Sequence, residues 1–181
     1  PAIKLKIMTA LSLEKPRGKS DLEKRLIGPL AERLFGGYPD LDYMLDLRAG
    51  NMPPNVELWE FYSKAGTFLN VLPQQRSHLP SNYTHVSRDA FWTQKTNVFG
   101  QMMACREING RMMYSMGCNT DICISANELL NGGKARGEKM VIVGEINENL
   151  PFMYGDAVYE ADKFDVFLKG PRFNYRLFGA P

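Results

Sequence analysis

The sequence has little of several features that define common protein classes. Only two histidines and three cysteines occur among its 181 residues, and the formal net charge is +2. No apolar run approaches the roughly 20 residues that a membrane-spanning helix needs. So small a net charge gives no reason to expect nucleic acid or an anionic membrane as a partner. We therefore expect a protein that binds neither nucleic acid nor membranes.

The cysteines Cys105, Cys118 and Cys123 are odd in number and show no C-x-x-C spacing. A disulfide framework is therefore disfavoured, and free thiols in a reducing compartment are expected. Residues 1–7 have the pattern of a strand rather than that of a signal peptide. Together these observations predict a cytoplasmic location.

The composition that is present fits a globular domain. Hydrophobic residues make up 44% of the chain and charged residues 23%, which excludes a disordered or low-complexity protein. The length suits one domain with a core of its own. We expect residues 1–181 to form a single α/β domain.

Strand and helix signals alternate along the first half of the chain. A strand is expected at residues 3–11. Ser20 and Glu23 form a capping box for a helix that Gly36-Gly37 ends, and Pro29 should kink or split it. The buried stripe of this helix is expected to consist of Leu22, Leu26, Leu30 and Leu34. Further expected elements are a strand at 41–47, a helix at 55–65, a strand at 68–72 and a loop with a short helix within 73–97.

The second half has clearer signals. Residues 97–108 and 111–117 read as a hairpin joined by the tight turn Asn109-Gly110. A helix from Thr120 should stop at Gly132-Gly133. Residues 140–143 form a continuous apolar strand, typical of a sheet covered on both faces, and residues 164–168 form a last strand. This alternation predicts an α/β fold with a largely parallel sheet flanked by helices.

Motifs for common catalytic chemistries are weak. His78 and His85 are seven residues apart, which does not match a two-histidine metal site, so no metal ligands are predicted. Cys118 precedes a helix and is an alternative thiol nucleophile, although small apolar packing is the favoured role of all three cysteines. Residues 131–139 are rich in glycine and basic residues. They follow a helix and precede a strand, the reverse of a phosphate cradle.

Five methionines lie on the two arms of the predicted hairpin. Core packing is the favoured explanation, and a surface that closes on a partner is the alternative. The five are Met102, Met103, Met112, Met113 and Met116.

The segment 147–156 is the most informative one. It follows the apolar strand at 140–143, and ligands of open α/β sheets bind outside the carboxyl ends of such strands. Its asparagines, the Pro151 turn and the pair Gly155-Asp156 favour a binding loop, with an ordinary turn as the alternative.

At this segment the sequence resembles the acetyl-CoA hydrolase/transferase family, which includes 4-hydroxybutyrate and succinyl-CoA:acetate CoA-transferases. The resemblance rests on the strand 141–143, Asn149, the step Leu150-Pro151 and the pair Gly155-Asp156. The strand 164–169 and the Ser-x-Gly motif Ser115-Met116-Gly117 continue it. Two features depart from the family pattern: the hairpin turn is the short Asn109-Gly110, and the family's first strands and helix are missing from the start.

The resemblance implies a CoA-transferase-like lobe of a two-lobe, ping-pong enzyme. In that family a glutamate of the second lobe attacks the acyl-CoA, giving an acyl anhydride and then a glutamyl-CoA thioester. No catalytic residue is therefore expected in this chain. The glutamates that do not match the nucleophile are Glu57, Glu60, Glu107, Glu128, Glu145, Glu148 and Glu160.

We expect this chain to form part of the N-terminal lobe and one wall of the acyl-CoA cleft. The expected substrate-binding residues are Gly155 and Asp156 first, then Asn149 and Tyr154, then Ser115 and Gly117. The expected partners are the C-terminal lobe, acyl-CoA, and a carboxylate or water, with no tightly bound cofactor; a homodimer is left open. The alternatives are a stand-alone small-ligand or nucleotide-binding α/β module and a non-catalytic interaction domain.

Overall fold

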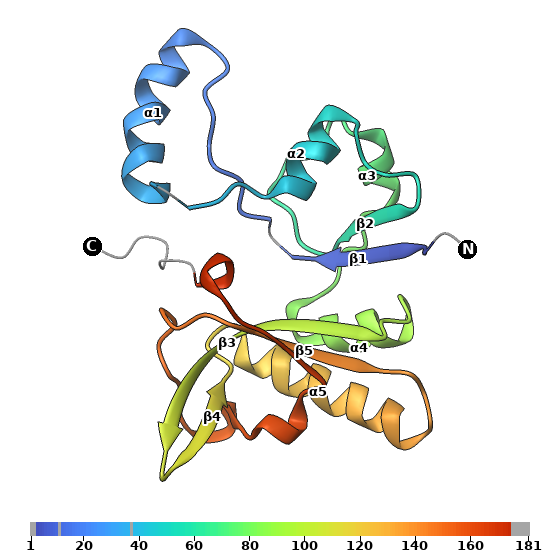
Figure 1. Ribbon diagram of the computed structural model, residues 1–181. Helices are drawn as coiled ribbons and strands as arrows, with labels where there is room; N and C mark the ends of the chain where they lie inside the picture. The colour runs from blue at the N-terminus through green and yellow to red at the C-terminus, as the bar shows by residue number, and fades with distance from the viewer. Residues whose placement is uncertain (1–2, 11, 37, 175–181) are drawn as a thin grey trace. The chain divides into compact units, whose positions relative to one another are not determined.

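The computed structural model describes residues 3–10, 12–36 and 38–174. The chain divides into two compact units, with the division between Asn82 and Tyr83. We call them the N-terminal unit and the C-terminal unit, and each is described by itself (Figure 1). Within the described ranges, no helix combines the length and the apolar character of a membrane span.

The N-terminal unit contains one parallel strand pair. β1 (Leu5–Thr9) pairs in register with β2 (Val56–Glu60). The helices of this unit are α1 (Asp21–Phe35), α2 (Asp42–Ala49) and α3 (Leu72–Arg76). The buried cluster of the unit consists of Met44, Leu58 and Phe68. The expected first strand is confirmed by β1.

The capping box of α1 is confirmed, but the predicted burial of its leucines is wrong. The Ser20 hydroxyl accepts a hydrogen bond from the Glu23 N–H at 3.2 Å, and the Glu23 carboxylate accepts one from the Ser20 N–H at 2.9 Å. The helix continues through Pro29 to Phe35. Leu22 and Leu26 are each 75% exposed, and Leu30 and Leu34 are also exposed. Periodicity locates an apolar face but does not show that another element covers it.

Three short predictions in the N-terminal unit are wrong. The segment 41–47 is predicted as a strand, but Leu41 is the N-cap of helix α2 and the following residues belong to that helix. The helix ends at Gly50, which has a left-handed φ of +73°. Residues 55–65 were expected as a helix and contain strand β2, whose alternate residues Leu58 and Glu60 are buried. Residues 68–72 form turns and the first residue of α3 rather than a strand. Short apolar segments fit both the helical and the strand periodicity, so packing decides which of the two structures forms.

The C-terminal unit is built on a larger sheet. Its strands are β3 (Val98–Ile108), β4 (Arg111–Ser115), β5 (Val141–Ile146), β6 (Val158–Tyr159) and β7 (Val166–Leu168). Its α-helices are α4 (Val86–Trp92) and α5 (Thr120–Ala135). Its 3-10 turns are Tyr83–His85, Gly155–Ala157, Ala161–Lys163 and Pro171–Phe173.

The sheet of the C-terminal unit is mixed, which corrects the prediction of a largely parallel sheet. In the described part of the chain the strand order is β6-β4-β3-β5-β7. The neighbours β3, β5 and β7 run parallel, whereas β4 is antiparallel to both β3 and β6. The tight turn causes this: Asn109 and Gly110 have φ values of +52° and +77°, which reverse the chain at once. The coarser prediction, an α/β fold with helices flanking the sheet, is confirmed.

Helix α5 lies along one face of the strands β3 and β5 (Figure 1). It does not stop at Gly132-Gly133 as expected, but continues to Ala135. Met103 and Met116 are fully buried in the core on this side, whereas Met112 on the hairpin is exposed. Core packing therefore explains only part of the methionine group.

Candidate functional site

The loop of residues 147–156 lies at the carboxyl edge of the parallel strands. β5 ends at Ile146, and the next residue, Asn147, donates its backbone N–H to the Met103 carbonyl at 2.9 Å. The Asn147 side chain is 1% exposed, and its Oδ1 accepts the Asn149 N–H at 3.0 Å. The loop therefore leaves the sheet in a fixed direction, at the edge where α/β proteins bind ligands.

Ser115 fixes the middle of this loop. It is completely buried at the end of β4. Its hydroxyl donates to the Met153 carbonyl at 2.7 Å and accepts from the Met153 N–H at 2.9 Å. One side chain thus satisfies both backbone groups of a residue 38 positions away, which holds residues 152–154 against the sheet.

Arg106 binds both neighbours of Met153. Its Nη1 donates to the Tyr154 hydroxyl at 2.7 Å, and its guanidinium lies 5.5 Å from the centre of the Phe152 ring. The two rings meet edge to face at 5.1 Å. Tyr154 is 63% exposed. Arg106 and Tyr154 are exposed and Phe152 is half-buried. Together the three side chains form a cationic and aromatic surface, which we call the Arg106 platform.

Asn149, a predicted site residue, lies at the other end of the loop and has a structural contact. Its side-chain Nδ2 donates to the Asn174 Oδ1 at 3.1 Å. The same Oδ1 accepts the Glu148 N–H at 2.8 Å, and Glu148 forms an ion pair with Lys169 at 3.3 Å. These contacts connect the start of the loop to the segment after β7.

Gly155 and Asp156, the first-ranked site residues, end the loop on its exposed side. Gly155 has a left-handed φ of +73°, and a Cβ there would meet nothing within 4 Å. Its glycine requirement is therefore conformational rather than steric. Asp156 is exposed, and its carboxylate forms no hydrogen bond or ion pair within residues 83–174.

The structure places Ser115 and Gly117 against the loop that contains Tyr154. A Cβ at Gly117 would lie 3.4 Å from the Pro151 carbonyl oxygen and 3.8 Å from the Leu150 side chain. The Met116 N–H donates to the Ala157 carbonyl at 3.1 Å. The loop therefore packs against the Ser-x-Gly segment, residues 115–117.

The carboxyl edge carries cationic side chains. Lys169 directly follows β7, and the hydrogen bond that it donates to the Glu148 carboxylate raises its pKa. Arg172 lies near enough to Glu145 to oppose the rise in the Glu145 pKa that burial causes. The edge thus carries three cationic side chains, of which Lys169 is paired with Glu148 and Arg172 lies near the Glu145 carboxylate.

The cysteines give no support to a thiol nucleophile. All three are free, and Cys123 is buried. Burial is the main cause that raises the Cys123 pKa to about 12, so its thiol stays protonated at neutral pH. Its Sγ donates to the Cys118 carbonyl at 3.4 Å. Cys118 is exposed, and no cationic hydrogen-bond partner of its thiol occurs within the described ranges.

Several polar residues of interest had no sequence signal. Arg106 and Phe152 carried no motif, because their contact depends on how the hairpin meets the loop.

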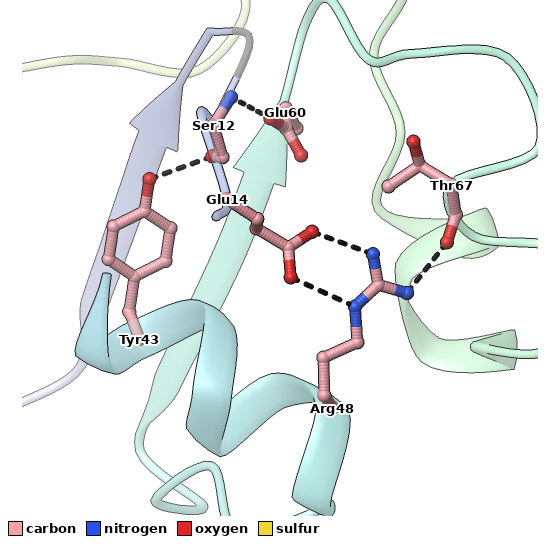
Figure 2. Close-up of polar contacts among 6 residues, drawn as sticks. All are labelled: Ser12, Glu14, Tyr43, Arg48, Glu60 and Thr67. Carbon is pink, nitrogen blue, oxygen red and sulfur yellow. Dashed lines mark hydrogen bonds and ion pairs between the residues drawn. The ribbon is translucent and has the colours of Figure 1, made fainter. Parts of the chain in front are cut away.

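In the N-terminal unit, a connected polar cluster beyond β1 and β2 consists of Ser12, Tyr43 and Glu60 (Figure 2). Within the described residues, no group of three or more histidine, cysteine or acidic side chains could hold a metal ion.

Comparisons with known proteins support the fold alone. No protein-family model matches the chain, and no curated protein matches it. Among solved structures, RipA from Yersinia pestis is similar with a TM-score of 0.53 and 14% identity, over 76% of this chain and 30% of RipA. The structure of a RipA point mutant gives a TM-score of 0.51 and 13% identity, over 98% of this chain and 39% of that one. The chain thus spans well under half the length of these proteins and is similar to part of their fold.

Proposed function

We propose that this chain is part of a CoA-transferase or acyl-CoA hydrolase, and that its C-terminal unit forms one wall of the acyl-CoA cleft. The observation that carries the proposal is the loop 147–156, held by Ser115 at the carboxyl edge of three parallel strands. Ligands of α/β sheets bind at such edges. The segment is also the one whose residues resemble the acetyl-CoA hydrolase/transferase family.

The chemistry of this edge suits coenzyme A. CoA carries phosphate groups and a purine ring. The Arg106 platform offers a guanidinium that makes one hydrogen bond to Tyr154 and retains further N–H donors for an anion. The rings of Phe152 and Tyr154 offer apolar area beside that charge. Arg172 and Lys169 are further cationic groups at the same edge, and Glu145 and Glu148 balance part of their charge.

The covalent step belongs to a glutamate outside this chain in the proposed enzyme. Here the residues of the C-terminal unit bind and orient the acyl-CoA rather than react with it. Ser115 acts through the loop, because its hydroxyl is used by Met153. This role is that of a positioning residue.

The test uses the longer protein that the proposal implies, with acetyl-CoA as substrate. Tyr154→Leu and Gly155→Val should each lower kcat/KM by about tenfold or more, equivalent to about 1.4 kcal/mol. Gly137→Val is the matched control, because Gly137 also has a left-handed φ, +81°, with open space around its Cβ, but lies in the turn before β5. Equal losses in Gly155→Val and Gly137→Val, or full activity in Tyr154→Leu, would contradict the proposal.

A further inference from the structure

The carboxyl edge of the parallel pair in the N-terminal unit contains a buried acid. Glu60 is the last residue of β2 and is 2% exposed. Its Oε1 accepts the Ser12 N–H at 2.8 Å (Figure 2). Its Oε2 is buried and has no hydrogen-bond partner. A carboxylate in this position is costly unless something supplies a donor and a positive charge.

Arg48, a cation that interacts electrostatically with Glu60, is already engaged in other contacts. Arg48 donates from Nη2 and Nε to the Glu14 carboxylate at 2.8 and 3.4 Å, and from Nη1 to the Thr67 carbonyl at 2.7 Å (Figure 2). The hydrogen bond to Glu14 is the main reason that the Arg48 pKa is raised, and the charge of Glu60 adds a smaller part. Arg48 therefore lies within electrostatic range of Glu60 without forming an ion pair with it.

Other polar groups gather at the same end of the strands. The Tyr43 hydroxyl and the Ser12 Oγ share a hydrogen bond of 2.7 Å. Burial is the main cause that raises the Tyr43 pKa, and the charge of Glu60 contributes to it. His78 lies opposite Glu60 in an isolated parallel bridge, and its Nδ1 is buried without a hydrogen-bond partner.

We propose that the N-terminal unit binds a primary ammonium group of a small molecule at Glu60. An ammonium group has three N–H donors and no acceptor. Acceptors at this end of the strands are the Glu60 Oε2, the His78 Nδ1 and the Tyr43 hydroxyl oxygen. The positive charge would compensate the buried carboxylate, and the site lies beyond the carboxyl ends of parallel strands. This inference goes beyond the proposed function and does not depend on it.

The test uses the whole chain and methylammonium chloride as the probe. The backbone amide of Ser12 is a direct reporter, since it donates to the Glu60 carboxylate. In amide proton–nitrogen NMR spectra, methylammonium should shift the Ser12 resonance with saturation. Potassium chloride and tetramethylammonium chloride at equal ionic strength should not, because neither cation offers N–H donors.

Two variants assign the effect to Glu60. Glu60→Gln should weaken binding at least tenfold, whereas Glu57→Gln on the exposed face of the same strand should leave it unchanged. If Glu60→Gln does not fold, as judged by circular dichroism, Tyr43→Phe replaces it and should weaken binding by removing one acceptor. No saturable shift, an equal shift with potassium, or binding that survives Glu60→Gln or its substitute Tyr43→Phe each overturns the proposal.

Discussion

Replacing Ser115 by alanine tests whether the loop 147–156 is held by one side chain. The hydroxyl is completely buried and satisfies both the N–H and the carbonyl of Met153. Alanine keeps the strand β4 intact and leaves these two backbone groups without their partner. The perturbation is therefore confined to the contact between the strand and the loop.

The loss of stability in Ser115→Ala depends on whether the loop keeps its position or moves into solvent. A net hydrogen bond contributes about 0.5–1.5 kcal/mol, and a buried group left unsatisfied costs about 1–3 kcal/mol. If residues 152–154 stay in place, two unsatisfied groups should cost about 2–6 kcal/mol. If they move outward and meet water, the loss should fall to about 1–3 kcal/mol, and the Arg106 platform should lose its arrangement.

Native-state hydrogen exchange of the whole chain measures this directly. The chain has two compact units, so a single unfolding transition cannot be assumed, and exchange reports each amide separately. The Met153 amide should exchange at least tenfold faster in Ser115→Ala. Ser125→Ala on the exposed side of α5 is the control and should change exchange little. Unchanged protection of Met153, with a stability loss below about 0.5 kcal/mol, would refute the reasoning.

Three further predictions concern turnover, thiol reactivity and acid stability. This chain alone should neither hydrolyse acetyl-CoA nor exchange CoA between acids; glutamate-dependent thioester cleavage in a coupled assay would contradict the proposed role. Iodoacetamide should label Cys118 before Cys123 by mass spectrometry, because burial raises the Cys123 pKa to about 12, and Cys123→Ser should cost about 1 kcal/mol or more. Asp165 accepts hydrogen bonds from Lys134 at 2.6 Å and from the Ile142 N–H at 2.7 Å, and both lower its pKa. Because the folded-state pKa is lowered, Asp165 stabilises the fold above its unfolded pKa of about 3.9, and this stabilisation is lost as pH falls through the folded-state pKa. In Asp165→Asn, the melting temperature should therefore fall less on acidification than in the unchanged protein. An equal fall in both proteins would contradict this role of Asp165.

The sequence by itself determined the elements whose ends carry a strong local signal, such as a helix cap or a tight turn. The capping box of Ser20 and Glu23 begins α1 as predicted, because both hydrogen bonds form within four residues. The turn Asn109-Gly110 specified the hairpin, because few other residues accept two successive left-handed φ values. The sequence also predicted the placement of the loop 147–156 after an apolar strand.

Tertiary structure decided what depends on partners distant in the sequence. Residues 42–49 and 56–60 exchanged their predicted states, since short apolar runs fit either period until they are packed. The role of Ser115 comes from Met153, 38 residues away, and the position of Glu60 comes from Ser12, 48 residues away. A hydroxyl or a carboxylate has the same appearance in the sequence whether it is solvated or buried. Only the fold determines which backbone groups it must satisfy, and which of its oxygens is left without a partner.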